Sequence, residues 1–297
     1  MQGDSSPLAR LASIRPSESE ARALRMYREA AAAELYAHYA PLAEAGSAHA
    51  QYELSRLYLF CTISPTDETM ALYEKDPRYD AKLEQYRKNH VRCAGFREVA
   101  GATDDLEQPM REWLRKASES GSPLARFELE VADCMNEVGP YARENAAAGS
   151  QSFSARRVPS QQLVYDVLTY ARGHEDPRVR YLSVRQAMFY FVWFVENERY
   201  LGEFNFDRTA GHVKRPPLSE AWRLLGCASS ANCSLEERLE SIARNYYSYE
   251  IHEIVATTLD LHSAIWQGDW SRLGYPQAEG RAPISLLPAP RRFKAAP

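Results

Sequence analysis

His252 and Glu253 are the residues whose types and spacing come nearest to a catalytic motif. A zinc-protease helix carries two histidines four residues apart, so that both imidazoles lie on one face beside a glutamate. Ala256 occupies the second histidine position here, and the next histidine, His262, lies ten residues after the first. No cysteine pair has the spacing typical of zinc sites either. We therefore expect no catalytic residue, no metal site and no cofactor.

The five cysteines allow two disulfides and one remaining thiol. Cys61 ends one expected helix and Cys93 lies in an expected helical hairpin, so a bond between them would pin the hairpin to that helix. Cys227 and Cys233 flank a short polar turn and form the second predicted pair. Cys134 is the cysteine that is predicted to stay outside both disulfides. Because disulfides persist in oxidising compartments, this pairing predicts a periplasmic or lipoprotein-anchored protein. The alternative is a cytoplasmic protein with five reduced, buried thiols.

Composition excludes several classes of protein. The 297 residues are 45% hydrophobic and 26% charged, which is typical of a folded globular chain. The longest apolar run, residues 187–195, is shorter than the roughly 20 residues that a transmembrane helix needs. The net charge of −4 creates no general attraction for phosphate backbones, so we expect no nucleic-acid partner. Residues 1–20 lack a signal-peptide pattern, which leaves open a lipid anchor at the native N-terminus.

The elements that must position these residues are predicted to be helices. Ser17 with Glu20 and Ser234 with Glu237 have capping-box spacing, and Gly46 lies where a helix should stop. The sequence signals of β-hairpin turns between alternating runs are missing. Helices are expected at 18–45 (bent or broken at Pro41), 48–60, 66–74, 77–99, 105–120, 123–138, 161–172, 177–200, 219–227 and 235–266. The fold predicted is all-α, an irregular stack of antiparallel helical hairpins that resembles an α-solenoid.

The predicted domain organisation follows from composition. Residues 1–16 should be a flexible segment, and 17–148 a repeat region with inserted helices at 62–104. A Ser- and Gly-rich linker is expected at 149–160, followed by a C-terminal helical region at 161–274 packed on the first region. Residues 275–297 form a Pro-rich tail that we expect to be extended.

An internal repeat relates residues 42–58 to residues 117–133 at an offset of 75. In each copy, a glycine ends one helix, a small alanine allows the next helix to approach closely, and an aromatic residue and a leucine fill the seam. The matched pairs are Glu44 with Glu119, Gly46 with Gly121, Ser47 with Ser122, Ala50 with Ala125, Tyr52 with Phe127, Glu53 with Glu128 and Leu54 with Leu129.

At these residues the chain resembles Sel-like repeats, short relatives of the tetratricopeptide repeat. The clearer copy is residues 113–129, with a basic-alanine helix, a glycine turn and a second helix. Two departures are Glu130, where the family usually has a small residue, and the insertion at 62–104. The resemblance covers about a third of the chain. It implies an array of helical hairpins that binds other proteins, frequently in the bacterial envelope, without a conserved chemistry.

The candidate protein-binding residues lie in the last long predicted helix. They are Tyr246, Tyr247, Tyr249, His252 and Glu253. Tyrosine is favoured at protein contacts, although core packing is the alternative for each ring. The function expected is a non-enzymatic scaffold or adaptor of the bacterial envelope, or an immunity protein that masks a secreted toxin or enzyme. Its partner is another protein. The alternatives are an all-α hydrolase or lyase acting on envelope polymers through an acidic cleft, and a self-associating structural protein.

Overall fold

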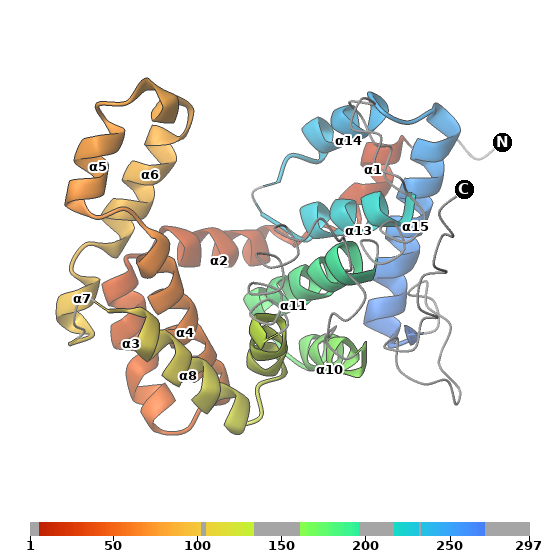
Figure 1. Ribbon diagram of the computed structural model, residues 1–297. Coiled ribbons are helices and arrows are strands. Elements are labelled where there is room, and N and C mark those ends of the chain that lie inside the picture. Colours follow the sequence, from red (N-terminus) through yellow and green to blue (C-terminus); the bar gives the residue numbers. More distant parts are fainter. Residues whose placement is uncertain (1–5, 102–104, 134–160, 196–216, 232, 271–297) are drawn as a thin grey trace, which may run out of the picture. The chain divides into compact units, whose positions relative to one another are not determined.

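The computed structural model describes residues 6–101, 105–133, 161–195, 217–231 and 233–270 (Figure 1). Within these ranges all regular elements are helical, which confirms the predicted all-α fold. The elements are α1 (Pro7–Ala12), α2 (Glu18–Glu29), α3 (Ala32–Glu44), α4 (Ala48–Ile63), α5 (Asp67–Tyr73), η1 (Pro77–Tyr79), α6 (Asp80–Cys93), α7 (Phe96–Val99), α8 (Glu107–Glu119), a helix at 123–133, α10 (Gln161–Arg172), α11 (Pro177–Phe189), the π-helical η2 (Tyr190–Val195), α13 (Pro217–Ala228), α14 (Leu235–Ala243) and α15 (Ser248–Gln267).

The chain divides into two compact units. One consists of residues 1–23 and 130–297, and the other of residues 24–129, so that the two boundaries fall within α2 and within the helix at 123–133. The linker predicted at 149–160, the tail predicted at 275–297 and Cys134 lie outside the described residues.

The unit of residues 24–129 contains two helical hairpins with the same turn. Gly46, between α3 and α4, and Gly121, between α8 and helix 123–133, each donate their N–H to the carbonyl three residues earlier at 3.0 Å. Both glycines have positive φ, 91° and 93°, which a residue without a Cβ adopts readily. Ser47 and Ser122 then accept the N–H three residues later, each at 3.3 Å. The 75-residue offset therefore holds for each of these hydrogen bonds.

The core of this unit lies around α3, α4 and the short helix α7. Leu54, Leu57 and Phe96 are at most 1% exposed. The Phe96 ring meets Tyr58 edge to face at 5.1 Å and Tyr36 at 5.8 Å. Phe96 lies near the end of the inserted segment 62–104, so α7 returns the insertion to the core of the repeat region. Between these points, α5 and α6 lie side by side and extend beyond the end of α4 (Figure 1).

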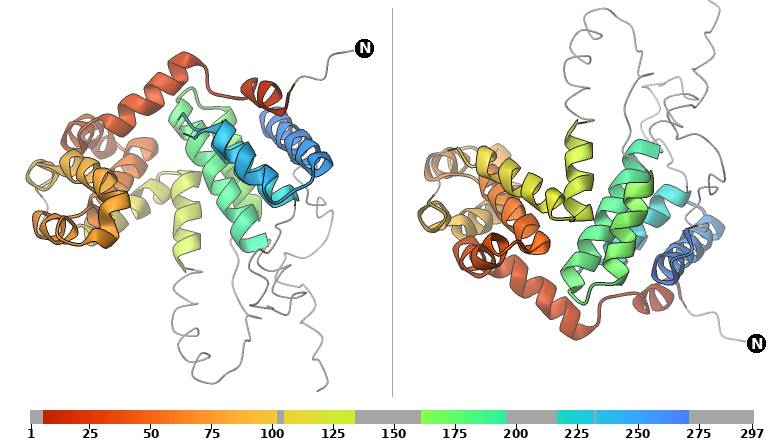
Figure 2. Two further views of the ribbon diagram at one scale, coloured as in Figure 1. Left: turned by 90° about the horizontal axis from the view of Figure 1, so that it is seen from above. Right: turned by 90° about the horizontal axis from the view of Figure 1, so that it is seen from below.

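The second unit is built around the antiparallel pair α10 and α11. These two helices pack against each other, α11 also packs against α13, and α13 against α15 (Figure 2). Trp222 of α13 is 1% exposed and stacks on Phe191 with ring centroids 4.4 Å apart. At the end of α15, the Arg172 guanidinium donates to the carbonyls of Trp266 and Gln267, both at 3.2 Å. This interaction joins α10 to α15.

The N-terminal residues differ from the expected flexible segment. Residues 7–12 form α1, whose first turn is capped by the Ser6 hydroxyl and begins with Pro7, a residue suited to that position. Leu11 is completely buried, and α1 packs on α14 and α15. Burial of this side chain explains why a six-residue helix persists here.

The prediction of one helix at 18–45, bent or broken at Pro41, placed the interruption wrongly. The break falls at residues 30–31, between α2 and α3, and Pro41 lies inside α3. The Arg92 guanidinium of α6 donates to the carbonyls of Ala30 at 3.0 Å and Tyr27 at 3.1 Å. The last carbonyls of a helix lack the N–H groups of a following turn, and here an arginine distant in sequence caps the helix end.

The predicted helix at 235–266 is likewise divided. α14 ends at Ala243, and α15 begins after Tyr247, whose backbone is extended with φ −70° and ψ 159°. The Tyr247 N–H donates to the Glu250 carboxylate at 2.8 Å, which satisfies a donor at the start of α15. Among the described helices, none is long and apolar enough to cross a membrane.

Candidate functional site

The predicted tyrosine segment lies at the junction of α14 and α15. Tyr246 is 8% exposed and contributes to the core, whereas Tyr247 and Tyr249 are 69% and 67% exposed. The rings of Tyr247 and Tyr249 are nearly parallel, with an interplanar angle of 9° and centroids 5.9 Å apart. Of the three tyrosines predicted to bind a partner, two therefore present their rings to solvent and one does not.

The start of α15 positions this ring pair. Tyr247 is held by its N–H contact with Glu250, and Tyr249 lies in the first turn of the helix. His252 and Glu253 follow one turn later and are exposed. Since residues three and four apart are neighbours on a helix surface, Tyr249, His252 and Glu253 share one face. We call Tyr247, Tyr249, His252 and Glu253 the α15 patch.

The segment of chain that carries the α15 patch is predominantly acidic. Between residues 234 and 256 the chain has five glutamates and two arginines. One of the arginines, Arg238, forms an ion pair with Glu220 of α13. The remaining arginine, Arg244, is exposed at the end of α14. The patch thus combines two exposed aromatic rings with one exposed carboxylate, on a segment that has more glutamates than arginines.

The inserted hairpin is a second exposed element, in the other unit. Met70 of α5 is buried, but no residue of α6 is. Tyr73, Tyr79 and Tyr86 contact one another, with Tyr73 lying 4.3 Å from Tyr79 and 4.8 Å from Tyr86 between ring centroids. The hairpin is therefore stabilised mainly by its own tyrosines and by its attachment to α4.

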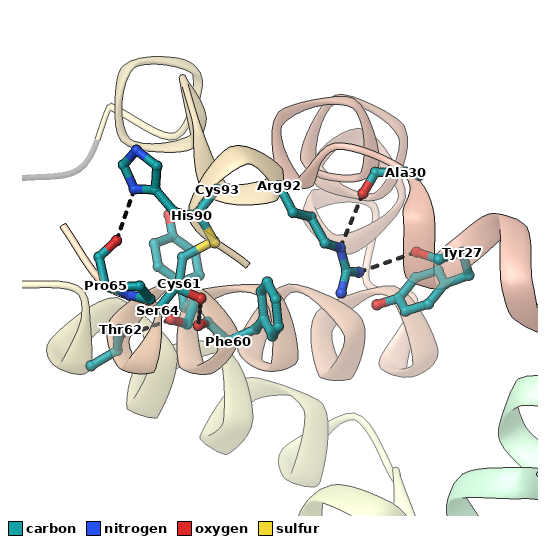
Figure 3. Close-up of a disulfide and its surroundings, with 11 residues drawn as sticks. Tyr27, Ala30, Phe60, Cys61, Thr62, Ser64, Pro65, His90, Arg92 and Cys93 are labelled. Carbon is teal, nitrogen blue, oxygen red and sulfur yellow. Dashed lines mark hydrogen bonds between the residues drawn. A yellow bond between two sulfur atoms is a disulfide. The ribbon is translucent and has the colours of Figure 1, made fainter. Parts of the chain in front are cut away.

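That attachment begins with the disulfide between Cys61 and Cys93, whose Cα atoms are 5.6 Å apart (Figure 3). Next to it, the His90 Nδ1 lies 2.9 Å from the Pro65 carbonyl oxygen. Arg92 extends in the other direction, over the Phe60 ring at 4.4 Å and to the end of α2 (Figure 3). Contacts of His90, Arg92 and Cys93, all within the last turn of α6, thus fix the base of the hairpin, and the sequence predicted the cysteine pair alone.

The second cysteine pair joins α13 to α14. Cys227 and Cys233 are bonded across the predicted polar turn, with Cα atoms 5.1 Å apart. Ser234 follows directly and caps α14 by accepting the Glu237 N–H at 3.2 Å. The disulfide and this cap together determine where α14 starts, in the same unit as the α15 patch.

The remaining residues that could act in catalysis or bind a metal ion do not form a cluster in the described part of the chain. His262, the second histidine of α15, accepts the Trp266 indole N–H at 2.7 Å, and burial lowers its pKa from the usual 6.5. Among the described residues, no group of three or more histidines, cysteines, aspartates or glutamates is placed to hold a metal ion.

Sequence reasoning missed the apolar side chains that the insertion exposes. Ile63, Leu72, Val91 and Val99 are between 51% and 72% exposed. The available signal was the composition of α6, in which leucine and valine are few and charged residues are many. Such a helix has too little apolar surface to be buried centrally.

Comparison with known proteins identifies no relative. No family model matches the chain, and neither a curated protein nor a solved structure matches it significantly.

Proposed function

We propose that this chain is a non-catalytic protein-binding scaffold or adaptor, a divergent helical repeat protein of the Sel-like kind, which binds its partner through the α15 patch. The observation that carries the proposal is the pair of parallel, exposed rings of Tyr247 and Tyr249. Large aromatic side chains are enriched in protein interfaces because they bury much surface at little cost in conformational entropy. The rings are held on a capped helix end, so little order must be gained on binding.

The repeat part of the proposal is supported by the two hairpin turns. Hydrogen bonds at Gly46 and Ser47 recur at Gly121 and Ser122 with the same geometry. A shared turn at a fixed offset is expected when a repeat unit has been duplicated. Sel-like proteins serve as adaptors in the bacterial envelope, and masking a secreted toxin or enzyme is the other role we assign to such a surface.

The location that we propose is the bacterial periplasm, either free or through a lipid anchor. Its support is the two cysteine pairs at bonding distance, Cys61 with Cys93 and Cys227 with Cys233. Disulfides of this kind are rare in the cytosol. A thiol count on denatured protein, isolated without reductant from its own cells, tests this location. One free thiol per chain supports it, and five free thiols contradict it.

Photo-crosslinking tests the binding function. A photoreactive phenylalanine replaces Tyr249, and the same group replaces Met26 of α2 as a control, since Met26 is 61% exposed. Irradiation of cells of the source organism should give a discrete adduct of the Tyr249 variant and none of the Met26 variant. Equal adducts from both positions, or none from either, would contradict binding through the α15 patch.

A further inference from the structure

We infer that the α15 patch binds an arginine side chain of the partner, with the guanidinium stacked on the tyrosine pair and paired with Glu253. This inference rests on the proposed function and adds the chemistry of the partner. Tyr247 and Tyr249 offer parallel ring faces, 9° apart in orientation and about two-thirds exposed. A planar guanidinium stacks on such a face and is attracted by its negative electrostatic potential.

Glu253 lies on the same face of α15 as the exposed rings. It follows Tyr249 by four residues, so its carboxylate projects from the same face as that ring. The residue is exposed, and its carboxylate has no ion pair or hydrogen bond with the described part of the chain. Glu250, by contrast, is occupied in capping Tyr247. Glu253 is thus the carboxylate of this turn that can accept a guanidinium in a bidentate arrangement.

The five glutamates and two arginines of residues 234–256 leave this stretch negative, and Arg238 is already paired with Glu220. A cationic partner segment is therefore attracted to the patch, and a carboxylate-rich segment is repelled. Arginine fits better than lysine because an ammonium group has no planar face to stack and cannot bridge both carboxylate oxygens.

Selection from a random peptide library tests the inference. Full-length protein with both disulfides intact is used to select binders from phage-displayed 12-residue peptides, and three selected peptides are synthesised with each arginine changed in turn to lysine or citrulline. We expect arginine to be enriched several-fold over the unselected library. At one arginine of each peptide, the change to lysine and the change to citrulline should each weaken binding about tenfold or more.

Variants of the protein test arginine recognition by Glu253 and binding through the two tyrosines separately. Glu253→Gln should weaken arginine peptides about fivefold and remove the preference for arginine over citrulline, whereas Glu68→Gln, an exposed glutamate of α5, should change neither. Tyr247→Ala with Tyr249→Ala should abolish binding, with Met26→Ala as the control. Thermal unfolding must match wild type for each variant.

The outcomes are distinct. Peptides that depend on the two tyrosines but carry no enriched arginine would overturn this inference and leave the proposed function standing. Peptides that bind equally well without the two tyrosines, or a library that yields no binder at all, would count against both.

Discussion

The Tyr52 hydroxyl donates a hydrogen bond to the Glu128 carboxylate at 2.7 Å and so joins the second helices of the two repeat copies. Arg56 donates to the same oxygen at 3.1 Å. Burial and the charge of Glu128 raise the pKa of Tyr52, which keeps its hydroxyl protonated as a donor. Phe127, the counterpart of Tyr52 in the second copy, has no hydroxyl, so the two copies share their turn hydrogen bonds but not this one.

Removal of this hydrogen bond should destabilise the repeat region. Tyr52→Phe leaves the ring in place but deprives Glu128 of a donor, and we expect a loss of about 1–3 kcal/mol in unfolding free energy, since the acceptor is charged. Urea unfolding of Tyr52→Phe, Glu128→Gln and the double variant measures the coupling. Strictly additive effects would show that the two residues do not interact.

The disulfide at the base of the inserted hairpin should control its order. Cys61→Ser with Cys93→Ser opens a loop of 32 residues, which corresponds to about 3–4 kcal/mol in the chain-entropy description. Because α6 has no buried residue, we expect amide exchange in α5 and α6 to accelerate at least tenfold. The matched control, Cys227→Ser with Cys233→Ser, should leave exchange in α5 and α6 unchanged.

His262 should make stability depend on pH. Its folded-state pKa is lowered by burial, so the unfolded chain binds a proton more readily than the folded chain does. Unfolding free energy should therefore be fully retained above about pH 6.5, the unfolded value, and should decrease as the pH falls below it. Thermal unfolding between pH 5 and 8 should show this dependence in wild type and less of it in His262→Gln.

The control for that measurement is His252→Gln, an exposed histidine of the same helix. Its pH dependence should equal that of wild type. A His262→Gln variant that keeps the full wild-type dependence would assign the effect to another group.

Gly268 should be intolerant of a side chain. It ends α15 with φ 76°, and an added Cβ would lie 2.2 Å from the Arg172 Nη1. We expect Gly268→Ala to cost more than the roughly 1 kcal/mol of backbone strain, because Arg172 must also leave the α15 carbonyls. In an Arg172→Ala background, the cost of Gly268→Ala measured by urea unfolding should fall to the strain alone. An unchanged cost would mean that Arg172 is not displaced.

Much of the helical architecture could be predicted because its signals are local. Capping residues and glycines act within one turn of the chain, so the ends at Gly46 and Gly121 and the start at Ser234 were recognisable. The cysteine pairs were indicated by their places along the chain, with Cys61 at the end of an expected helix, Cys93 in the expected hairpin, and Cys227 and Cys233 on either side of a polar turn.

The candidate site was predictable only in part. The tyrosine-rich segment was recognised, but the single helix expected at 235–266 would place Tyr246 and Tyr249, three residues apart, on one face. In the structure, the chain turns between α14 and α15, which buries Tyr246 and exposes Tyr249. A periodicity argument assumes a continuous helix, so an unrecognised break reverses the face on which later residues lie.

The sequence alone therefore determined the all-α fold and the two similar hairpin turns, because these depend on contacts within a few residues, and it indicated the two cysteine pairs. The tertiary structure decided where long helices break and which side chains stay exposed. Arg92 ends α2 from a helix more than 60 residues away, and burial of Leu11 stabilises an N-terminal helix. Such contacts depend on the free energy of packing between distant segments, which no local pattern encodes.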